Sequence, residues 1–296
     1  MNEEQKWIKE KLRHFIKHRK TLYQTADRCM SYEYCTTNPS DSRGYVFNSR
    51  GQMYVPSLRN MEKDSIYQVC PFENIVYSKD TTANVDFHDL QLMLYENVVA
   101  EMDRKFLRRH LFREDKEHES PDGNTVRLVF RSEKHKEDRG FIVMDTARCV
   151  ILESGRTTGL ECNLDEKISP FMLTILSSMA GLRFSGWTIA NRITFKEIDN
   201  LYYPAHITYR YHERYSIKSK PSNDGKHEER LSYKEATLTL KPDTATGDMS
   251  FGRYYDIPHE PHATIIYIER KRHYQNRMAM DQMPRVYKPL QDTAMQ

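Results

Sequence analysis

The clearest pattern of apolar and polar positions lies in residues 202–217, which read YYPAHITYRYHERYSI. After Pro204, alternate positions carry apolar and aromatic side chains with Glu213 as the exception, namely Ala205, Ile207, Tyr209, Tyr211 and Tyr215. The other positions are polar or basic: His206, Thr208, Arg210, His212, Arg214 and Ser216. Because successive side chains of a strand point to opposite faces, this stretch predicts a long strand with one apolar and one basic face.

Weaker alternation predicts further strands, at residues 29–35, 124–133, 187–198, 229–240 and 262–274. Two hairpins and one interrupted strand are also predicted: residues 45–55 turning at 48–51, residues 141–153 turning at 145–148, and residues 65–77 broken by Pro71. The dipeptide Asp199–Asn200 joins two long strands, and Asn tolerates the positive φ that such a turn requires.

Three segments have helical periodicity. Residues 3–20 form an amphipathic pattern with Ile8, Leu12, Phe15 and Ile16 on one stripe. Residues 87–112 carry apolar side chains at every fourth position from Leu90 to Met102, which predicts one helix, or two with a bend. Residues 168–180 are the most apolar stretch and predict a short buried helix that ends at Gly181.

Consecutive strands joined by short loops predict antiparallel meanders, and helices that come as insertions predict an α+β fold. The predicted architecture is a strongly curved antiparallel sheet, an open half-barrel, with helices covering its concave side. Residues 1–275 are expected to form a single domain with an N-terminal helix and inserted helices near 87–112 and 168–180. Residues 276–296, which contain Pro284 and Pro289, are expected to form a flexible C-terminal tail.

The composition excludes several classes of protein. The 296 residues include 19 Tyr and 12 Phe, too many aromatic residues for a disordered chain. The net charge of +3, from 45 basic and 42 acidic residues, gives little support to a dedicated nucleic-acid-binding protein. The five cysteines include no CxxC pair, which argues against a disulfide framework or a zinc site.

No sequence motif indicates catalysis or a cofactor. The chain has no glycine-rich phosphate loop, no GxSxG elbow and no HExxH motif. His259 and His262 flank Glu260 and Pro261, but the proline prevents the helix that would bring the two rings to one metal ion. We therefore expect a non-enzymatic protein without a metal or another cofactor.

The N-terminal twenty residues are charged throughout, and no apolar run approaches the ~20 residues that a membrane-spanning helix needs. The sequence as written predicts a cytoplasmic protein without a transmembrane segment. If a leader peptide has been removed, the expected location is the cell envelope.

The order of elements in residues 124–270 resembles that of the LolA-like (lipoprotein-carrier) superfamily, and especially its large, poorly characterised bacterial relatives. The resemblance lies in a strand pair with a turn and a proline, here Ile198, Asp199, Asn200, Leu201, Tyr202, Tyr203, Pro204, Ile207 and Tyr209. Asn200 stands where glycine would be usual. The resemblance implies an open half-barrel with helices as a lid, which holds a lipid or another apolar group and has no catalytic residue.

On this reading, the apolar cavity is lined by Trp187, Ile189, Ile193, Phe195, Ile207, Tyr209 and Tyr211. The expected partner is an apolar ligand or a lipidated protein. Three alternatives remain open: an ordinary filled core in place of a cavity, a nucleic-acid or protein-interaction module that uses the basic outer face, and a hydrolase without a recognisable motif. Basic runs at Arg104–Lys105, Arg108–Arg109 and Arg270–Arg272 are the residues that the second of these would use.

Overall fold

We describe the protein from a computed structural model of the chain. The structure describes residues 3–39, 44–58, 67–79, 88–118, 123–159, 182–217, 228–242, 254–257 and 284–290. The helices are α1 (Glu3–Leu22), α3 (His88–Tyr95), α4 (Val98–Glu101) and α5 (Arg104–Arg109). The strands are β1 (Arg28–Asn38), β2 (Tyr45–Val55), β3 (Tyr67–Ser78), β4 (His110–Glu114), β5 (Thr125–Ser132), β6 (Arg139–Asp145), β7 (Val150–Gly159), β8 (Leu182–Ile198), β9 (Leu201–Ile217), β10 (Glu228–Pro242), β11 (Tyr255–Ile257) and β12 (Val286–Pro289).

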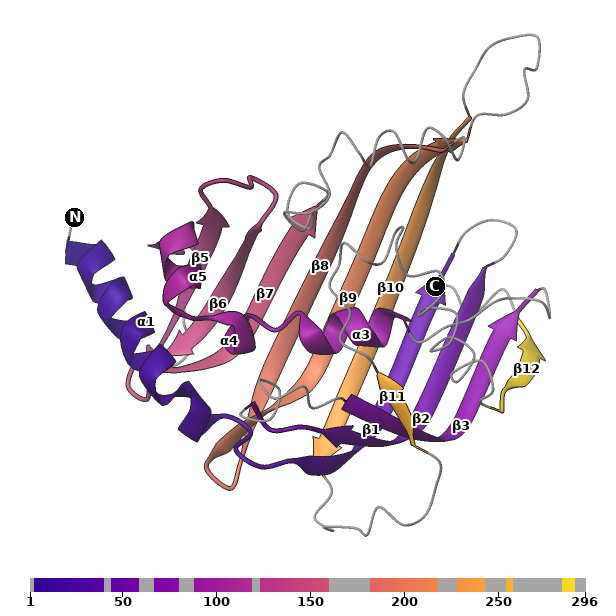
Figure 1. The fold of residues 1–296 in the computed structure, drawn as a ribbon, viewed down its shortest axis with the longest axis horizontal. Coiled ribbons are helices and arrows are strands. Elements are labelled where there is room, and N and C mark those ends of the chain that lie inside the picture. Colours follow the sequence, from indigo (N-terminus) through magenta and orange to yellow (C-terminus); the bar gives the residue numbers. More distant parts are fainter. Residues whose placement is uncertain are drawn as a thin grey trace.

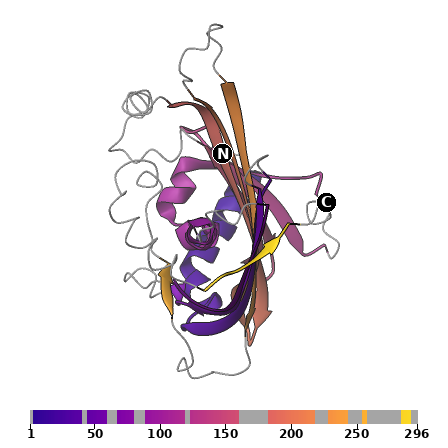
Figure 2. The same cartoon turned by 90° about the vertical axis from the view of Figure 1, so that its right-hand side faces the viewer.

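The strands form one 12-stranded sheet in the order β11-β3-β2-β1-β10-β9-β8-β7-β6-β5-β4, with β12 beside β3. Neighbours along this path are antiparallel, and β12 pairs with β3 in parallel. The sheet does not close, because β11 and β4 lie at opposite ends of the path. Helices α1, α3, α4 and α5 lie against the same, concave face (Figures 1 and 2). The predicted α+β fold with a curved antiparallel sheet and covered concave side is confirmed.

The two longest strands meet at a tight turn. β8 and β9 pair from Leu182 opposite Ile217 to Ile198 opposite Leu201. The intervening Asp199 and Asn200 have φ angles of 53° and 63°. A two-residue hairpin loop with positive φ at both positions matches the right-handed twist of the strands. The predicted turn is therefore confirmed, with Asn200 supplying the conformation that glycine would otherwise supply.

The predicted hairpin at residues 45–55 is wrong, because β2 runs through this segment as a continuous strand. Its pairing with β3 shifts register between Arg50 and Gly51, so the Asn–Gly signal marks a β-bulge and not a turn. Gly51 lies opposite Pro71, and a Cβ atom at Gly51 would clash with the carbonyl oxygen of Cys70. Pro71 interrupts the pairing at this irregularity without ending β3, which continues to Ser78.

The helix predicted at residues 87–112 is divided into three helices, and its last residues form a strand. Asn97 and Asp103 cause the division, because each is an N-cap that starts a new helix. The Asn97 side chain accepts a hydrogen bond from Val99 N, and that of Asp103 accepts one from Phe106 N. From His110 the chain pairs with β5, so the helical pattern ends before residue 112.

Helix α1 protects the edge strand β4. Gln5 Nε2 donates a hydrogen bond of 2.6 Å to the carbonyl oxygen of Phe112. Glu4 Oε1 accepts a hydrogen bond of 3.3 Å from Glu114 N. Side chains of α1 thus occupy backbone groups that another strand would otherwise pair with, which is a recognised way to prevent edge-to-edge association.

Several sequence predictions fall outside the described residues, including the helix at 168–180 and the strand at 262–274. Part of the expected flexible tail is instead a strand, since β12 pairs with β3 from Val286 opposite Ile75 to Pro289 opposite Ser78. The part of the β3 edge that lies beyond β11 provides the hydrogen-bonding groups for this contact. Over the described part of the chain, no helix has the length and apolar character needed to cross a membrane.

We expect Asn200→Val to lower the free energy of unfolding by about 1–2 kcal/mol, because a β-branched residue is disfavoured at positive φ. Asn200→Gly is the matched control and should stay within about 0.5 kcal/mol of the wild type. Urea unfolding followed by circular dichroism measures both values. Equal stability of the two variants would show that the turn does not require the left-handed conformation.

Candidate functional site

Apolar side chains form rows across the concave face of the sheet. Ile193 of β8 lies opposite Ile207 of β9, which lies opposite Leu238 of β10, and Leu238 lies opposite Tyr34 of β1. Each of these four side chains is buried. Because directly paired residues project from the same face of a sheet, the row is a continuous apolar strip across four strands.

The structure brings together most of the residues predicted to line an apolar cavity. Five of them are buried in one core cluster, with exposures of 9% or less: Ile189, Ile193, Phe195, Ile207 and Tyr209. Tyr211 is half-buried and packs against the same cluster. The side chain of Trp187 lies outside the described residues. The alternation that assigned residues 206–212 of β9 to two faces is therefore correct for this segment.

The rest of this face was not predicted from the sequence. Strands β1 and β10 contribute Met30, Tyr32, Tyr34, Ala236, Leu238 and Leu240, all buried. The signal was present, since both segments alternate, but their position beside β9 follows from the pairing of β10 with both β1 and β9. A contact between β1 and β10 joins residues some 200 positions apart in sequence, as with Met30 opposite Pro242, and alternation alone does not specify such a pairing.

Helix α3 covers this apolar face. Its side chains Leu90, Met93 and Leu94 have exposures of 2% or less and belong to the same core cluster as the strands. Figure 1 shows α3 crossing β8, β9 and β10, and Figure 2 shows it beside the sheet on the side that also carries α1. The apolar face is thus filled by a helix in the state that the structure describes.

Polar contacts fasten both ends of α3 to the sheet. At its start, Asp89 Oδ2 lies 2.9 Å from Lys234 Nζ and accepts a hydrogen bond of 3.2 Å from Thr36 Oγ1. At its end, Asn191 Nδ2 donates to the carbonyl oxygens of Met93 and Glu96, at 3.3 and 2.8 Å. These contacts satisfy a buried carboxylate and two carbonyl groups near the helix C-terminus.

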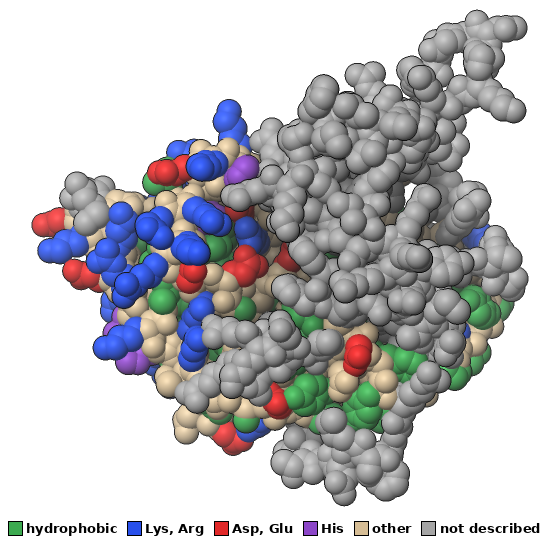
Figure 3. Space-filling model, viewed as in Figure 1, with side chains coloured by type: hydrophobic (Ala, Val, Ile, Leu, Met, Phe, Trp, Pro, Cys, Tyr) green, Lys and Arg blue, Asp and Glu red, His purple; other side chains and the backbone are tan. Residues whose placement is uncertain are grey.

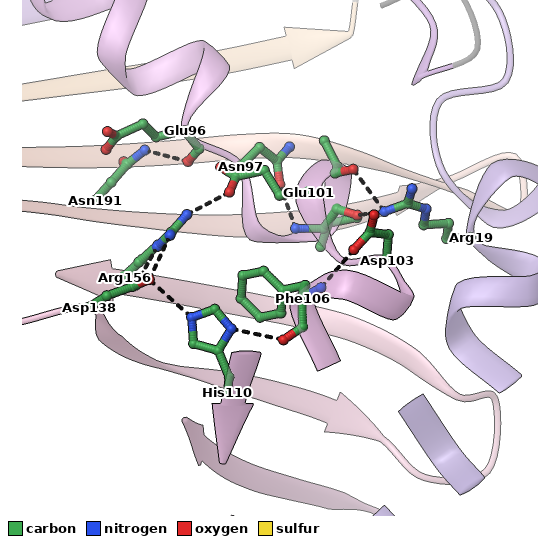
Figure 4. Close-up of polar contacts among 12 residues, drawn as sticks. Arg19, Glu96, Asn97, Glu101, Asp103, Phe106, His110, Asp138, Arg156 and Asn191 are labelled. Carbon is green, nitrogen blue, oxygen red and sulfur yellow. Dashed lines mark hydrogen bonds and ion pairs between the residues drawn. The ribbon is translucent and has the colours of Figure 1, made fainter. Parts of the chain in front are cut away.

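A second set of polar contacts, which includes a network of charged side chains, fastens α4 and α5. One nitrogen of the Arg19 guanidinium, on α1, donates to the carbonyl oxygens of Val99, Ala100 and Met102 at 2.5–2.9 Å. On β7, Arg156 holds the Asp138 carboxylate through two hydrogen bonds of 2.8 and 3.0 Å. A third donor of Arg156 reaches Glu101 at 2.5 Å (Figure 4). Bidentate arginine–carboxylate pairs are both stronger and more directional than single contacts.

His110 completes this network. Its Nδ1 lies 2.9 Å from the carbonyl oxygen of Phe106, and its Nε2 lies 3.0 Å from Asp138 Oδ2 (Figure 4). Both ring nitrogens therefore face oxygen atoms of the protein. The ring also stacks on Phe106 with 4.0 Å between centroids. Both ring nitrogens are thus engaged within the protein.

The pKa values of two carboxyl groups in this region are shifted in opposite directions. Burial, followed by the nearby Glu101 carboxylate, raises the pKa of Glu96 to about 8, although Arg156 opposes the shift. For Asp138, burial acts to raise the pKa, but hydrogen bonds from His110 and Arg156 outweigh it and lower the pKa to about 2. Asp138 therefore stays ionised in its network, whereas Glu96 is protonated at neutral pH.

No cluster of three potential metal ligands occurs within the described ranges. His259 and His262, which were considered as metal ligands from the sequence, lie outside those ranges. His206 and His212 are exposed on the outer side of β9. Cys29, Cys35, Cys70 and Cys149 are free thiols, and Cys162 lies outside the described residues.

Comparison with known proteins gives structural neighbours only. No family model matches the chain. A search of curated protein sequences also gives no match. Among solved structures, a domain described as an outer membrane lipoprotein-sorting protein from Vibrio parahaemolyticus matches with a TM-score of 0.28 and 10% identity, over 78% of this chain and 92% of that chain.

Two further solved structures match at a similar level. A DUF1329 family protein from Desulfovibrio piger matches with a TM-score of 0.29 and 7% identity, over 83% of this chain and 97% of that chain. The MucA/MucB complex of Pseudomonas aeruginosa matches with a TM-score of 0.22 and 8% identity, over 82% of this chain and 100% of that chain. A lipoprotein-sorting domain, the kind of protein that the sequence resemblance named, is thus among these neighbours. At these TM-scores the likeness carries no argument about function.

The raised pKa of Glu96 predicts a pH dependence of stability. The folded protein binds this proton more tightly than the unfolded chain, so the stability that it contributes is lost as pH rises from about 4.5 to about 8. Urea unfolding across this range should show that Glu96→Gln removes about 1–3 kcal/mol of the decline. Glu117→Gln, at an exposed position, is the control and should leave the profile unchanged. A profile of Glu96→Gln that follows the wild type would contradict the assignment.

Proposed function

We propose that this chain is a non-enzymatic carrier that holds a lipid or another apolar group against the concave face of its sheet. The observation that supports the proposal most strongly is the covering of that face. The sheet is unclosed and has a continuous apolar surface, and the short helix α3 covers that surface. Displacement of α3 would expose a surface that an acyl chain can occupy, with burial of apolar area as the driving force.

The contacts of the helical segment suggest which part of it moves. Helices α4 and α5 are held by Arg19 and by the network of Arg156, Asp138 and His110. Helix α3 is held by the Asp89–Lys234 ion pair at one end and by hydrogen bonds of Asn191 and Tyr95 at the other. We therefore expect α3 to swing away from the sheet while α4 and α5 stay in place, with the hinge at Glu96–Asn97, between the two helices.

The groups that fasten α3 would also suit the head of an amphipathic ligand. When α3 is displaced, the ammonium of Lys234, the hydroxyl of Thr36 and the amide of Asn191 lose the partners described above. All three project from strands that form the apolar face. They can donate hydrogen bonds to carboxylate, ester or phosphate oxygens, while the apolar row that contains Ile193 and Ile207 contacts the acyl chain of the ligand. The ligand class is thus an acyl chain with an oxygen-rich head group.

The non-enzymatic part of the proposal is supported by the state of the titratable groups. The His110 ring uses both nitrogens, and the Asp138 carboxylate is bound by Arg156 and His110 together. Such a network positions structural elements and leaves no group free to act as a base. Glu96, with its raised pKa, lies where α3 ends and is assigned here to the hinge.

Asp89→Asn tests the movement of α3. The substitution removes the ion pair with Lys234 and keeps a side chain that can accept a hydrogen bond from Thr36. We expect uptake of a fluorescent fatty acid to become about tenfold faster, which corresponds to a ~1.4 kcal/mol lower free energy of opening. Stopped-flow fluorescence measures the rate, and Glu117→Gln provides a control that changes one carboxylate away from α3.

The carrier proposal fails if neither the wild type nor Asp89→Asn binds the fatty acid, and if native mass spectrometry of the gently purified protein finds no bound lipid. Uptake at equal rates by both proteins would retain the carrier and reject α3 as its cover. Circular dichroism of each variant confirms that it is folded.

A further inference from the structure

The end of the sheet formed by β4, β5 and β6 carries two basic grooves with apolar floors. The first has a volume of 1110 Å³ and lies between α1, α5 and β4. The second has a volume of 650 Å³ and lies over β4, β5 and β6. Gln5, Leu111 and Phe112 line both grooves, so the two meet at β4. We call this region the β4 end.

Exposed cations line both grooves. The first groove is lined by Lys9, Arg13, Lys17, Arg104 and Arg108, and the second by Arg113, Arg127, Arg131 and Arg139. Arg127 is paired with Asp115 and is only half-exposed, so it is not counted as an available cation. Figure 3 shows Lys and Arg side chains gathered where Figure 1 places α1 and α5.

The cations of the first groove are spaced so that neighbouring positive charges repel. Lys9, Arg13 and Lys17 recur at every fourth position of α1, as do Arg104 and Arg108 on α5, so neighbours in each row repel along the helix. Within the described residues, none of these five side chains forms an ion pair. Of the described residues that line the first groove, Glu133 is the one acid. The fold therefore maintains a local excess of positive charge.

The same excess occurs on the sheet. Arg131 of β5 lies directly opposite Arg139 of β6, and like charges at paired positions destabilise a sheet. On its other side, Arg131 lies opposite Leu111 of β4. Leu111 is 46% exposed, so an aliphatic side chain reaches the surface among these cations. A row of one exposed leucine and two arginines, neither of which forms an ion pair with another described residue, thus crosses this outer face.

We infer that the β4 end docks the protein onto an anionic lipid membrane. Repelling cations are relieved by a surface of many negative charges, and each Lys or Arg beside an anionic membrane adds a favourable electrostatic contribution. The exposed Leu111 enters the interfacial region as apolar side chains of membrane-surface proteins do. This inference goes beyond the proposed function and does not depend on it.

The aromatic residues of the β4 end favour a membrane over a nucleic acid. Non-specific binding of single strands uses exposed aromatic rings on which bases stack. Here Phe112 is 7% exposed. The Arg127 guanidinium covers the ring of Phe141, with 4.1 Å between Arg127 Cζ and the ring centroid. The exposed apolar contact is instead the aliphatic Leu111, which suits lipid and offers no stacking surface.

Co-sedimentation with vesicles tests this inference. Wild-type protein should bind vesicles of equimolar phosphatidylglycerol and phosphatidylcholine, should bind pure phosphatidylcholine vesicles weakly, and should be released by salt. The double variant Arg131→Glu/Arg139→Glu should lower the affinity at least about tenfold. Lys196→Glu/Lys241→Glu is the matched control, because it changes the net charge equally at exposed positions of β8 and β10 and should retain most of the binding.

Leu111→Gln should lower the affinity severalfold without affecting folding, because this side chain is already exposed. Three results would overturn the inference: no binding to the anionic vesicles, equal losses in the two double variants, or tighter binding of a single-stranded oligonucleotide than of the vesicles. Fatty-acid uptake by Arg131→Glu/Arg139→Glu should equal that of the wild type, so loss of docking and loss of the carrier activity are distinguishable.

Discussion

The structure depends on one physical constraint: the sheet is curved and unclosed, so its concave apolar face needs a cover that the strands do not provide. Rows such as Ile193, Ile207, Leu238 and Tyr34 would otherwise be in contact with water. Among the described residues, the cover is supplied by α1 and by the segment from α3 to α5. Its short helices fit against a curved face better than one straight helix would, and the N-caps Asn97 and Asp103 create the two breaks.

The polar contacts of this cover divide it into two parts. Around α4 and α5, a network that includes Asp138, Arg156 and His110 satisfies buried charges mutually, and removal of one member would leave an uncompensated charge. Around α3, the described contacts are one ion pair, between Asp89 and Lys234, and hydrogen bonds of Asn191 and Tyr95, and they form no comparable network of charges. This difference in fastening, together with the continuous apolar strip beneath, is why we assign α3 to the moving part and the sheet to the carrier surface.

Alternation along the chain was sufficient to predict the local features of the sheet. It assigned His206–His212 of β9 to two faces correctly, and the positive φ of Asn200 confirms the turn between β8 and β9. The prediction of a hairpin at residues 45–55 was wrong because its turn signal is compatible with two backbone structures. Gly51 could serve a turn or a bulge, and the pairing of β2 with β3 along its whole length, a tertiary contact, selected the bulge.

Of the candidate site, only residues within one strand pair were predicted from the sequence. Ile207 and Tyr209 were identified from their own strand, whereas the contributions of β1 and of α3 depend on contacts distant in sequence. The polar fastening was not predicted, because Asp89, Asn191 and Arg156 are ordinary surface residue types until the fold buries them. A buried ion pair has no periodic signal in a sequence in which charged residues make up 29%.

The most direct test of the central claim is native-state hydrogen exchange resolved by residue. The account predicts that amides of α3 exchange through an opening with a lower free energy than that of β9, whose amides should exchange only on global unfolding. Added fatty acid should slow exchange in β9 and not in α3. Exchange of α3 and β9 with the same free energy, changing together with global stability, would show that helix and sheet form one inseparable core and would contradict the account.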